Sequence, residues 1–180
     1  MTTTTEFQRF TAPDAAQLER DIATARLRFA QAEALGDDAA LVEHATDLGS
    51  LLTTARREAE ALAVLEPQRS RAEGLAGREA AAWYWNALAT ALQYLGRREE
   101  AEPLFDKAVQ QCRRGGWQAL QAMVQHHWGR SLVEQGRLDE ARRQLAAALA
   151  IRQALGHPRL ASTQRALEAL AELPSRAWRA

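Results

Sequence analysis

The sequence predicts an all-α fold built from repeated helical hairpins, and three observations support this prediction. The composition is rich in Ala, Leu, Arg, Glu and Gln, which favour helices, and poor in β-branched residues after the opening threonine run. Three segments of the chain align without a gap at a spacing of 40 residues. Glycines fall between the helical patterns, where a left-handed residue can end one helix before the next begins. At 180 residues, the chain is expected to form one domain.

Apolar and small side chains recur at matching positions of the three segments. In the middle segment, these positions hold Trp85, Leu88, Ala89, Leu92, Gly96, Ala101, Phe105 and Ala108. At a distance of 40 residues on either side, the chain has Gln125, Trp128, Gly129, Leu132, Gly136, Ala141, Leu145 and Ala148, and Ala45, Leu48, Gly49, Leu52, Arg56, Ala61, Leu65 and Gln68. The large residues return every three or four positions, which is the period of an amphipathic helix. The small residues allow two helices to cross closely.

Local signals predict where each helix begins and ends. Asp14 can cap the first helix, because its carboxylate can accept hydrogen bonds from the unpaired amides of the first turn. Breaks that contain glycine follow near 36–38, 74–77, 96, 115–116, 136 and 156–158. The predicted helices are 14–35, 38–54, 57–74, 78–95, 98–114, 117–135, 138–155 and 158–172. Pro67 should kink or break its helix, whereas Pro103 lies near a helix start, where the missing amide costs least.

The helices group into three repeats with a cap at each end. We expect a single domain at 13–173, with repeats at about 38–77, 78–117 and 118–157 and cap helices at 14–35 and 158–172. The first repeat is the least regular, because Arg56 takes the place of the turn glycine. We expect residues 1–12 to form a flexible N-terminal segment and residues 174–180 to form a flexible tail. Within these two segments, the side chains that could dock on the helices are those of Phe7, Phe10 and Trp178.

The repeat pattern resembles the tetratricopeptide repeat (TPR) family. The family places an aromatic residue, then Leu-Gly, in its first helix, and Ala with an aromatic residue in its second. Here the corresponding residues are Trp85, Leu88, Ala89, Leu92, Ala101 and Phe105, and Trp128, Gly129, Leu132, Ala141 and Leu145. The spacing of 40 exceeds the usual period of about 34, which indicates a long-period variant. The resemblance implies a right-handed helical-hairpin solenoid with capping helices.

Composition and charge disfavour several classes of partner and location. The 23 basic and 23 acidic side chains balance, so we expect neither a nucleic-acid nor a membrane partner. Cys112 is the only cysteine, and no signal peptide or membrane-spanning run is evident, so we expect a cytoplasmic protein. Acidic residues predominate over 1–66 and arginines over 137–180. This asymmetry suggests at most a weak homo-oligomer formed by head-to-tail contacts.

The chain carries no convincing catalytic or metal-binding motif. Glu43, His44 and Asp47 lack the second histidine of a metalloprotease motif. His126 and His127 are adjacent and point about 100° apart on a helix, so a metal site would need acids from another helix. We therefore predict that the protein is not an enzyme and has neither a cofactor nor a metal.

A binding groove is the functional feature that the resemblance implies. In the family, the first helix of each repeat lines a concave groove with the side chains that do not pack against the second helix. Transferred onto this chain, the predicted groove residues are Trp83, Asn86, Thr90, Tyr94, Met123, His126 and Arg130. The first repeat would add Glu43, Thr46, Ser50, Thr53 and Thr54. Because Arg130 can bind a carboxylate, we expect a partner segment that combines an apolar side chain with an acidic group or a free C-terminus.

The predicted function is therefore that of a protein–protein interaction module. It would act as an adaptor or scaffold that binds a peptide or protein segment in the concave groove. Two alternatives stay open: a ligand- or peptide-sensing unit of a bacterial regulatory system, and a self-assembling structural protein. A copurifying protein would favour the adaptor, a small ligand or short peptide would favour the sensor, and mass by light scattering would test self-assembly.

Overall fold

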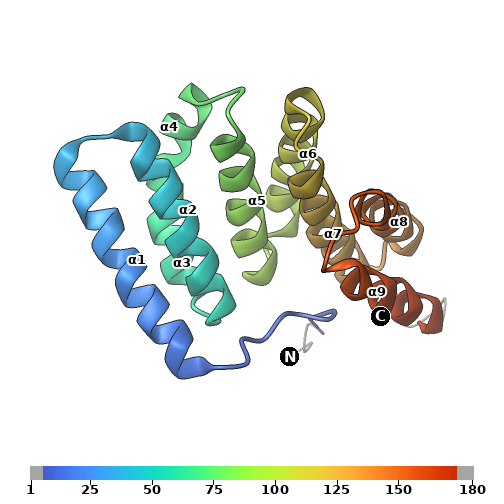
Figure 1. Cartoon of the computed structure of the whole chain (residues 1–180). Coiled ribbons are helices and arrows are strands. Elements are labelled where there is room, and N and C mark those ends of the chain that lie inside the picture. Colours follow the sequence, from blue (N-terminus) through green and yellow to red (C-terminus); the bar gives the residue numbers. More distant parts are fainter. Residues whose placement is uncertain (1–5, 174–180) are drawn as a thin grey trace. The chain divides into compact units, whose positions relative to one another are not determined.

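The computed structural model describes residues 6–173, and its regular secondary structure over this range is helical (Figure 1). The all-α prediction is confirmed, and the observed helix ends lie close to the predicted ones. Residues 1–5 and 174–180, including Trp178, lie outside the described range. The helices are α1 (Ala15–Leu35), α2 (Asp38–Thr54), α3 (Glu58–Leu65), η1 (Glu66–Gln68), α4 (Arg69–Gly74), α5 (Glu79–Tyr94), α6 (Arg98–Gly115), α7 (Gln118–Glu134), α8 (Leu138–Ala154) and α9 (Leu160–Glu172).

The chain divides into two compact units. One unit is Phe10–Gly115 and holds α1 to α6, whereas the other combines residues 6–9 with 116–173 and holds α7 to α9. In the first unit, α2 packs against α1, α3 and α5, and α5 packs against α6. Figure 1 shows α1, α2 and α5 side by side in this unit. In the second unit, α8 packs against both α7 and α9. The range predicted as one domain, 13–173, spans both units.

The turn inside each predicted repeat has the same backbone geometry. Arg56, Gly96 and Gly136 occupy equivalent positions with φ of 62°, 79° and 73°. The amide of the next residue then bonds back to the preceding helix, as Arg57 N–H to Leu52 O, Arg97 N–H to Leu92 O, and Arg137 N–H to Leu132 O, at 2.9, 2.9 and 3.0 Å. The first repeat therefore keeps the turn although it lacks the glycine, at the cost of a left-handed arginine.

The proline in the first repeat interrupts its helix as predicted. Pro67 lies in η1, between α3 and α4, and the Arg69 amide bonds to Glu66 O. The Leu65 carbonyl instead accepts a hydrogen bond from the Tyr84 hydroxyl of α5 at 2.9 Å. The helix break thus leaves a buried carbonyl whose hydrogen bond is supplied by the neighbouring hairpin.

In two hairpins, a glycine of the first helix lies close against a leucine of the second. A Cβ atom built on Gly129 of α7 would lie 2.7 Å from Leu145 Cγ of α8. A Cβ atom on Gly49 of α2 would lie 2.7 Å from the Leu65 side chain of α3 in the same way. The predicted packing residues Leu48, Leu88, Ala101, Phe105, Ala141 and Leu145 are buried, and Trp128 is partly buried. The register of the repeat is confirmed at these positions.

Candidate functional site

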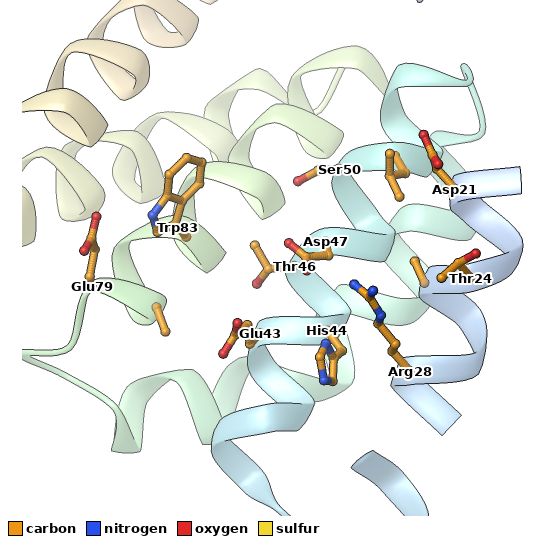
Figure 2. A pocket seen from close by; sticks show the side chains of 13 residues that line it. Asp21, Thr24, Arg28, Glu43, His44, Thr46, Asp47, Ser50, Glu79 and Trp83 are labelled. Carbon is orange, nitrogen blue, oxygen red and sulfur yellow. The ribbon is translucent and has the colours of Figure 1, made fainter. Parts of the chain in front are cut away.

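A cavity of about 750 Å³ lies among α1, α2 and the first half of α5 (Figure 2). It lies within the unit Phe10–Gly115. Figure 2 shows Glu79 and Trp83 on one side of the cavity, α1 on the other, and the side chains of α2 between them. The lining residues are Asp21, Thr24, Ala25, Arg28, Glu43, His44, Thr46, Asp47, Ser50, Leu51, Glu79, Ala80 and Trp83.

Helical spacing places these side chains on the faces of the helices that border the cavity. On α2, Glu43, Asp47 and Ser50 are separated by four and three residues, so they lie one above another on one face. On α5, Glu79 and Trp83 are four residues apart and also share a face. The opposite face of α2 carries buried side chains such as Leu48, which hold the helix against its neighbours. Packing therefore fixes the direction in which the polar side chains point.

The cavity is predominantly acidic. Asp21, Glu43, Asp47 and Glu79 contribute four carboxylates, whereas Arg28 is the one lysine or arginine among the described lining residues. Partial burial is the main cause that raises the pKa of Asp47, and the nearby charge of Glu43 raises it further. The charges of His44 and Arg28 act in the opposite direction. Four carboxylates against one arginine give the cavity an excess of acidic groups, which favours a cationic ligand.

Trp83 supplies the large apolar surface of the site. The residue is 40% exposed, an unusual degree for a tryptophan inside a packed helical unit. The sequence predicted Trp83 as a groove residue, together with Glu43, Thr46 and Ser50, and all of these line the cavity. The cavity therefore combines an exposed aromatic ring with several carboxylates.

The other predicted groove residues of α5 do not line this cavity. Asn86 is buried, with 5% of its surface exposed, and its carbonyl accepts a hydrogen bond from the Thr90 hydroxyl at 2.7 Å. Thr90 and Tyr94 are half-buried. Their groove role remains a prediction.

The predicted groove residues of α7 belong to the other unit. Met123 is half-buried, whereas His126 and Arg130 are buried. His126 Nδ1 lies 3.2 Å from the Thr163 hydroxyl of α9, and burial, reinforced by nearby arginines, lowers the pKa of His126 to about 3. Arg130 donates a hydrogen bond to the main-chain carbonyl of Phe7. His126 is therefore a neutral packing residue, and Arg130 has an intramolecular acceptor.

Sequence reasoning missed the contribution of α1 to the cavity. Asp21, Thr24 and Arg28 line the wall formed by α1, which the sequence indicated only as a cap helix. Glu79 was also missed, because it precedes the repeat positions used for the alignment. The excess of acidic residues over 1–66 was the available signal, but it did not identify which of them meet.

Across 6–173, no group of three or more His, Cys, Asp or Glu side chains is placed to hold a metal ion. In the same part of the chain, no helix combines the length and apolar character needed to cross a bilayer.

The helical hairpins α5–α6 and α7–α8, joined by matching turns, define a helical-repeat protein. The model of the tetratricopeptide repeat family matches residues 82–114 and 122–158. These segments, which cover most of the two hairpins, are tetratricopeptide repeats, as the sequence predicted. Repeats of this family generally mediate protein–protein interaction.

A solved structure supports the same fold. The crystal structure of BtubC (BKLC) from P. vanneervenii matches with a TM-score of 0.68 and 23% sequence identity. The match covers 87% of this chain and 66% of the BtubC chain, so this chain spans less than two thirds of that protein. At this identity the likeness shows the fold alone. A search of curated proteins found no significant match.

Proposed function

We propose that the acidic cavity binds a segment of a partner protein that presents a basic side chain beside a large apolar one. The observation that carries this proposal is the set of four carboxylates that line the cavity together with the exposed Trp83. Carboxylates form charge-assisted hydrogen bonds with arginine or lysine, and an exposed tryptophan can pack against an apolar or guanidinium group. The protein would then act as an adaptor, in keeping with the interaction role of its repeats.

The cavity has a suitable size for this role. At about 750 Å³, it falls in the range of pockets that bind compact ligands, and it can hold a few side chains rather than a whole domain. Its charge favours a basic segment over the acidic one that the sequence suggested. The expectation of an acidic partner depended on Arg130, which lies in the other unit and donates to Phe7.

Selection from a peptide library tests the proposal, because it samples many candidate partner segments at once. Random heptapeptides displayed on phage would be selected on the immobilised full chain. We expect the enriched peptides to contain Arg or Lys next to a Leu, Phe or Trp. Binding of a synthetic enriched peptide, measured by fluorescence anisotropy, should weaken at least about tenfold on Trp83→Ala and on the paired change Glu43→Gln with Asp47→Asn. It should also weaken as salt is raised.

The control is an exposed carboxylate outside the cavity. Glu99 lies near the start of α6, so Glu99→Gln changes the net charge as a single cavity substitution does but should leave peptide affinity unchanged. Enrichment of acidic peptides, or an equal response to the Glu99 and Asp47 substitutions, would contradict the proposal.

A further inference from the structure

Residues 6–9 are bound to the unit that contains α7 to α9. The main chain of Phe7 makes two hydrogen bonds to α7. Its N–H donates to Glu134 Oε1 at 3.0 Å, and Arg130 Nε donates to its carbonyl at 2.8 Å. The side chain of Gln8 donates to the Arg165 carbonyl of α9 at 3.2 Å. Two helices therefore hold this short segment.

The ring of Phe7 fills an apolar site next to these bonds. It is 8% exposed, although it comes from a segment without regular structure. By contrast, Phe10 is 58% exposed. The site therefore distinguishes two phenylalanines that are three positions apart. Phe7 belongs to one buried cluster with Leu132, Val133, Ala141, Leu145, Ala166 and Leu170.

Arg130 and Glu134 form a clamp for the main chain of one residue. They are one turn apart on α7, and they are 5% and 7% exposed. Buried charged groups are costly unless they are paired or hydrogen-bonded, and the Phe7 main chain supplies a donor to Glu134 and an acceptor to Arg130. The two hydrogen bonds use only main-chain atoms of the bound residue, whereas the apolar site selects for its side chain. The following residue, Gln8, has φ of 47°, so it must tolerate the left-handed conformation.

We propose that Arg130, Glu134 and the apolar site beside them bind a chain segment anchored by a phenylalanine, and that residues 6–9 of the protein are a tethered, releasable ligand of this site. A partner segment with the same chemistry competes with residues 6–9 for the clamp. Its anchor is an aromatic side chain with a free main-chain N–H and carbonyl, followed by a residue that accepts a positive φ. This site belongs to the unit that does not hold the acidic cavity, so it does not depend on the function proposed above.

The position of the segment in the chain favours release over permanent attachment. Residues 6–9 precede α1 and lie outside the helices, so their release breaks no hydrogen bond of a helical ladder. Segments of this kind open at a lower free-energy cost than the helices beneath them. A short tether also gives residues 6–9 a high effective concentration at the site, so an external ligand must compete with them.

A synthetic peptide of residues 1–13 tests the site in the full chain. In the Phe7→Ala protein, the tethered segment lacks its anchor, so the labelled peptide should bind with measurable affinity by fluorescence anisotropy. Binding to the wild-type protein should be at least about tenfold weaker, because residues 6–9 occupy the site. Equal affinity for the two proteins would overturn the proposal, as would an absence of binding to a folded Phe7→Ala protein.

Variant peptides distinguish specific binding through Phe7 from nonspecific binding. Against the Phe7→Ala protein, peptides with Phe7→Ala or with an N-methylated Phe7 should bind at least about tenfold more weakly, because each loses one element of recognition. The Phe10→Ala peptide should bind like the original. Adding Asp47→Asn to the Phe7→Ala protein should change nothing, which separates this site from the acidic cavity. A Phe10→Ala peptide that loses as much affinity as the Phe7→Ala peptide would refute the clamp.

Hydrogen exchange of the wild-type protein decides the question if Phe7→Ala fails to fold. The Phe7 amide should exchange at least about tenfold more slowly than in the free peptide, because Glu134 accepts its hydrogen bond. It should also exchange much faster than the amide of Leu145 in α8, because the segment opens locally. An unprotected Phe7 amide would show that the segment is not bound. Exchange at the same rate as Leu145 would show that it is a fixed part of the fold.

Discussion

Replacing Gly129 by alanine tests how closely α7 and α8 pack. The new Cβ atom would lie 2.7 Å from Leu145 Cγ and 3.3 Å from the main-chain oxygen of Ala141. Leu145 is fully buried and the oxygen belongs to the helix backbone, so neither atom can move away easily. Overpacking of this kind costs about 1–3 kcal/mol, and the better helix propensity of alanine returns about 1 kcal/mol. We expect Gly129→Ala to lower the free energy of unfolding by about 1 kcal/mol.

Two other glycines provide matched controls in urea denaturation. The three atoms nearest to a Cβ atom at Gly49 belong to Leu65, at 2.7–3.0 Å, and Leu65 is as fully buried as Leu145, so Gly49→Ala should destabilise to a similar extent as Gly129→Ala. Gly74 ends α4 and has nothing within 4 Å of a Cβ atom, so Gly74→Ala should be neutral or stabilise by up to about 1 kcal/mol. Gly74→Ala should therefore be more stable than both Gly49→Ala and Gly129→Ala.

A double-mutant cycle checks that the cost at Gly129 comes from Leu145. Leu145→Ala alone should destabilise by about 2–5 kcal/mol, because it leaves a cavity. In that background the added methyl group meets no leucine side chain, so Gly129→Ala should become neutral or stabilising, a coupling of about 1 kcal/mol or more. If Gly129→Ala stabilised the wild-type protein as much as Gly74→Ala does, the close approach of the two helices would be refuted.

Two further predictions concern a turn and a histidine. Arg56→Gly should raise the free energy of unfolding by about 0.5–1 kcal/mol, because glycine adopts a φ of 62° without the steric cost that arginine bears. Urea denaturation measures this change, and a lower free energy of unfolding would contradict the prediction. The pKa of His126 is about 3 in the folded protein, whereas an unfolded histidine binds a proton below about pH 6.5. Stability should therefore fall from pH 6.5 toward pH 3, and His126 contributes up to about 1.4 kcal/mol per unit to this slope. His126→Gln should reduce the slope in urea titrations at several pH values, and His127, whose pKa burial also lowers, should account for a remaining part.

The helices could be predicted from the sequence because their signals are local. Apolar spacing identified each buried face, and the effect of Pro67 on its helix followed from its missing amide. The turn at Arg56 was predicted less well from the sequence pattern. The missing glycine suggested an irregular repeat, yet the backbone there has the same left-handed geometry as at Gly96. Tertiary packing of the hairpin outweighs the conformational preference of one residue.

The sites were harder to predict because they depend on contacts between distant segments. Helical periodicity indicates that Glu43 and Trp83 point away from the buried stripes, but it does not reveal that α1 brings Asp21 to the same cavity. Phe7 lies in a segment without periodicity, and no local signal distinguishes it from Phe10. Only the fold shows that Arg130, which we assigned to a partner's carboxylate, donates to the Phe7 carbonyl.

The contact between Phe7 and Glu134 also constrains the order in which the protein can fold. These residues are 127 positions apart, whereas neighbouring helices such as α5 and α6 meet across a short turn. Hairpins can form as soon as their two helices have left the ribosome, because their contacts are local. Phe7 is made long before Leu170 of α9, which its site requires. Until α9 has been made, therefore, the ring has no completed site in its own chain, and its burial must be among the last steps of folding.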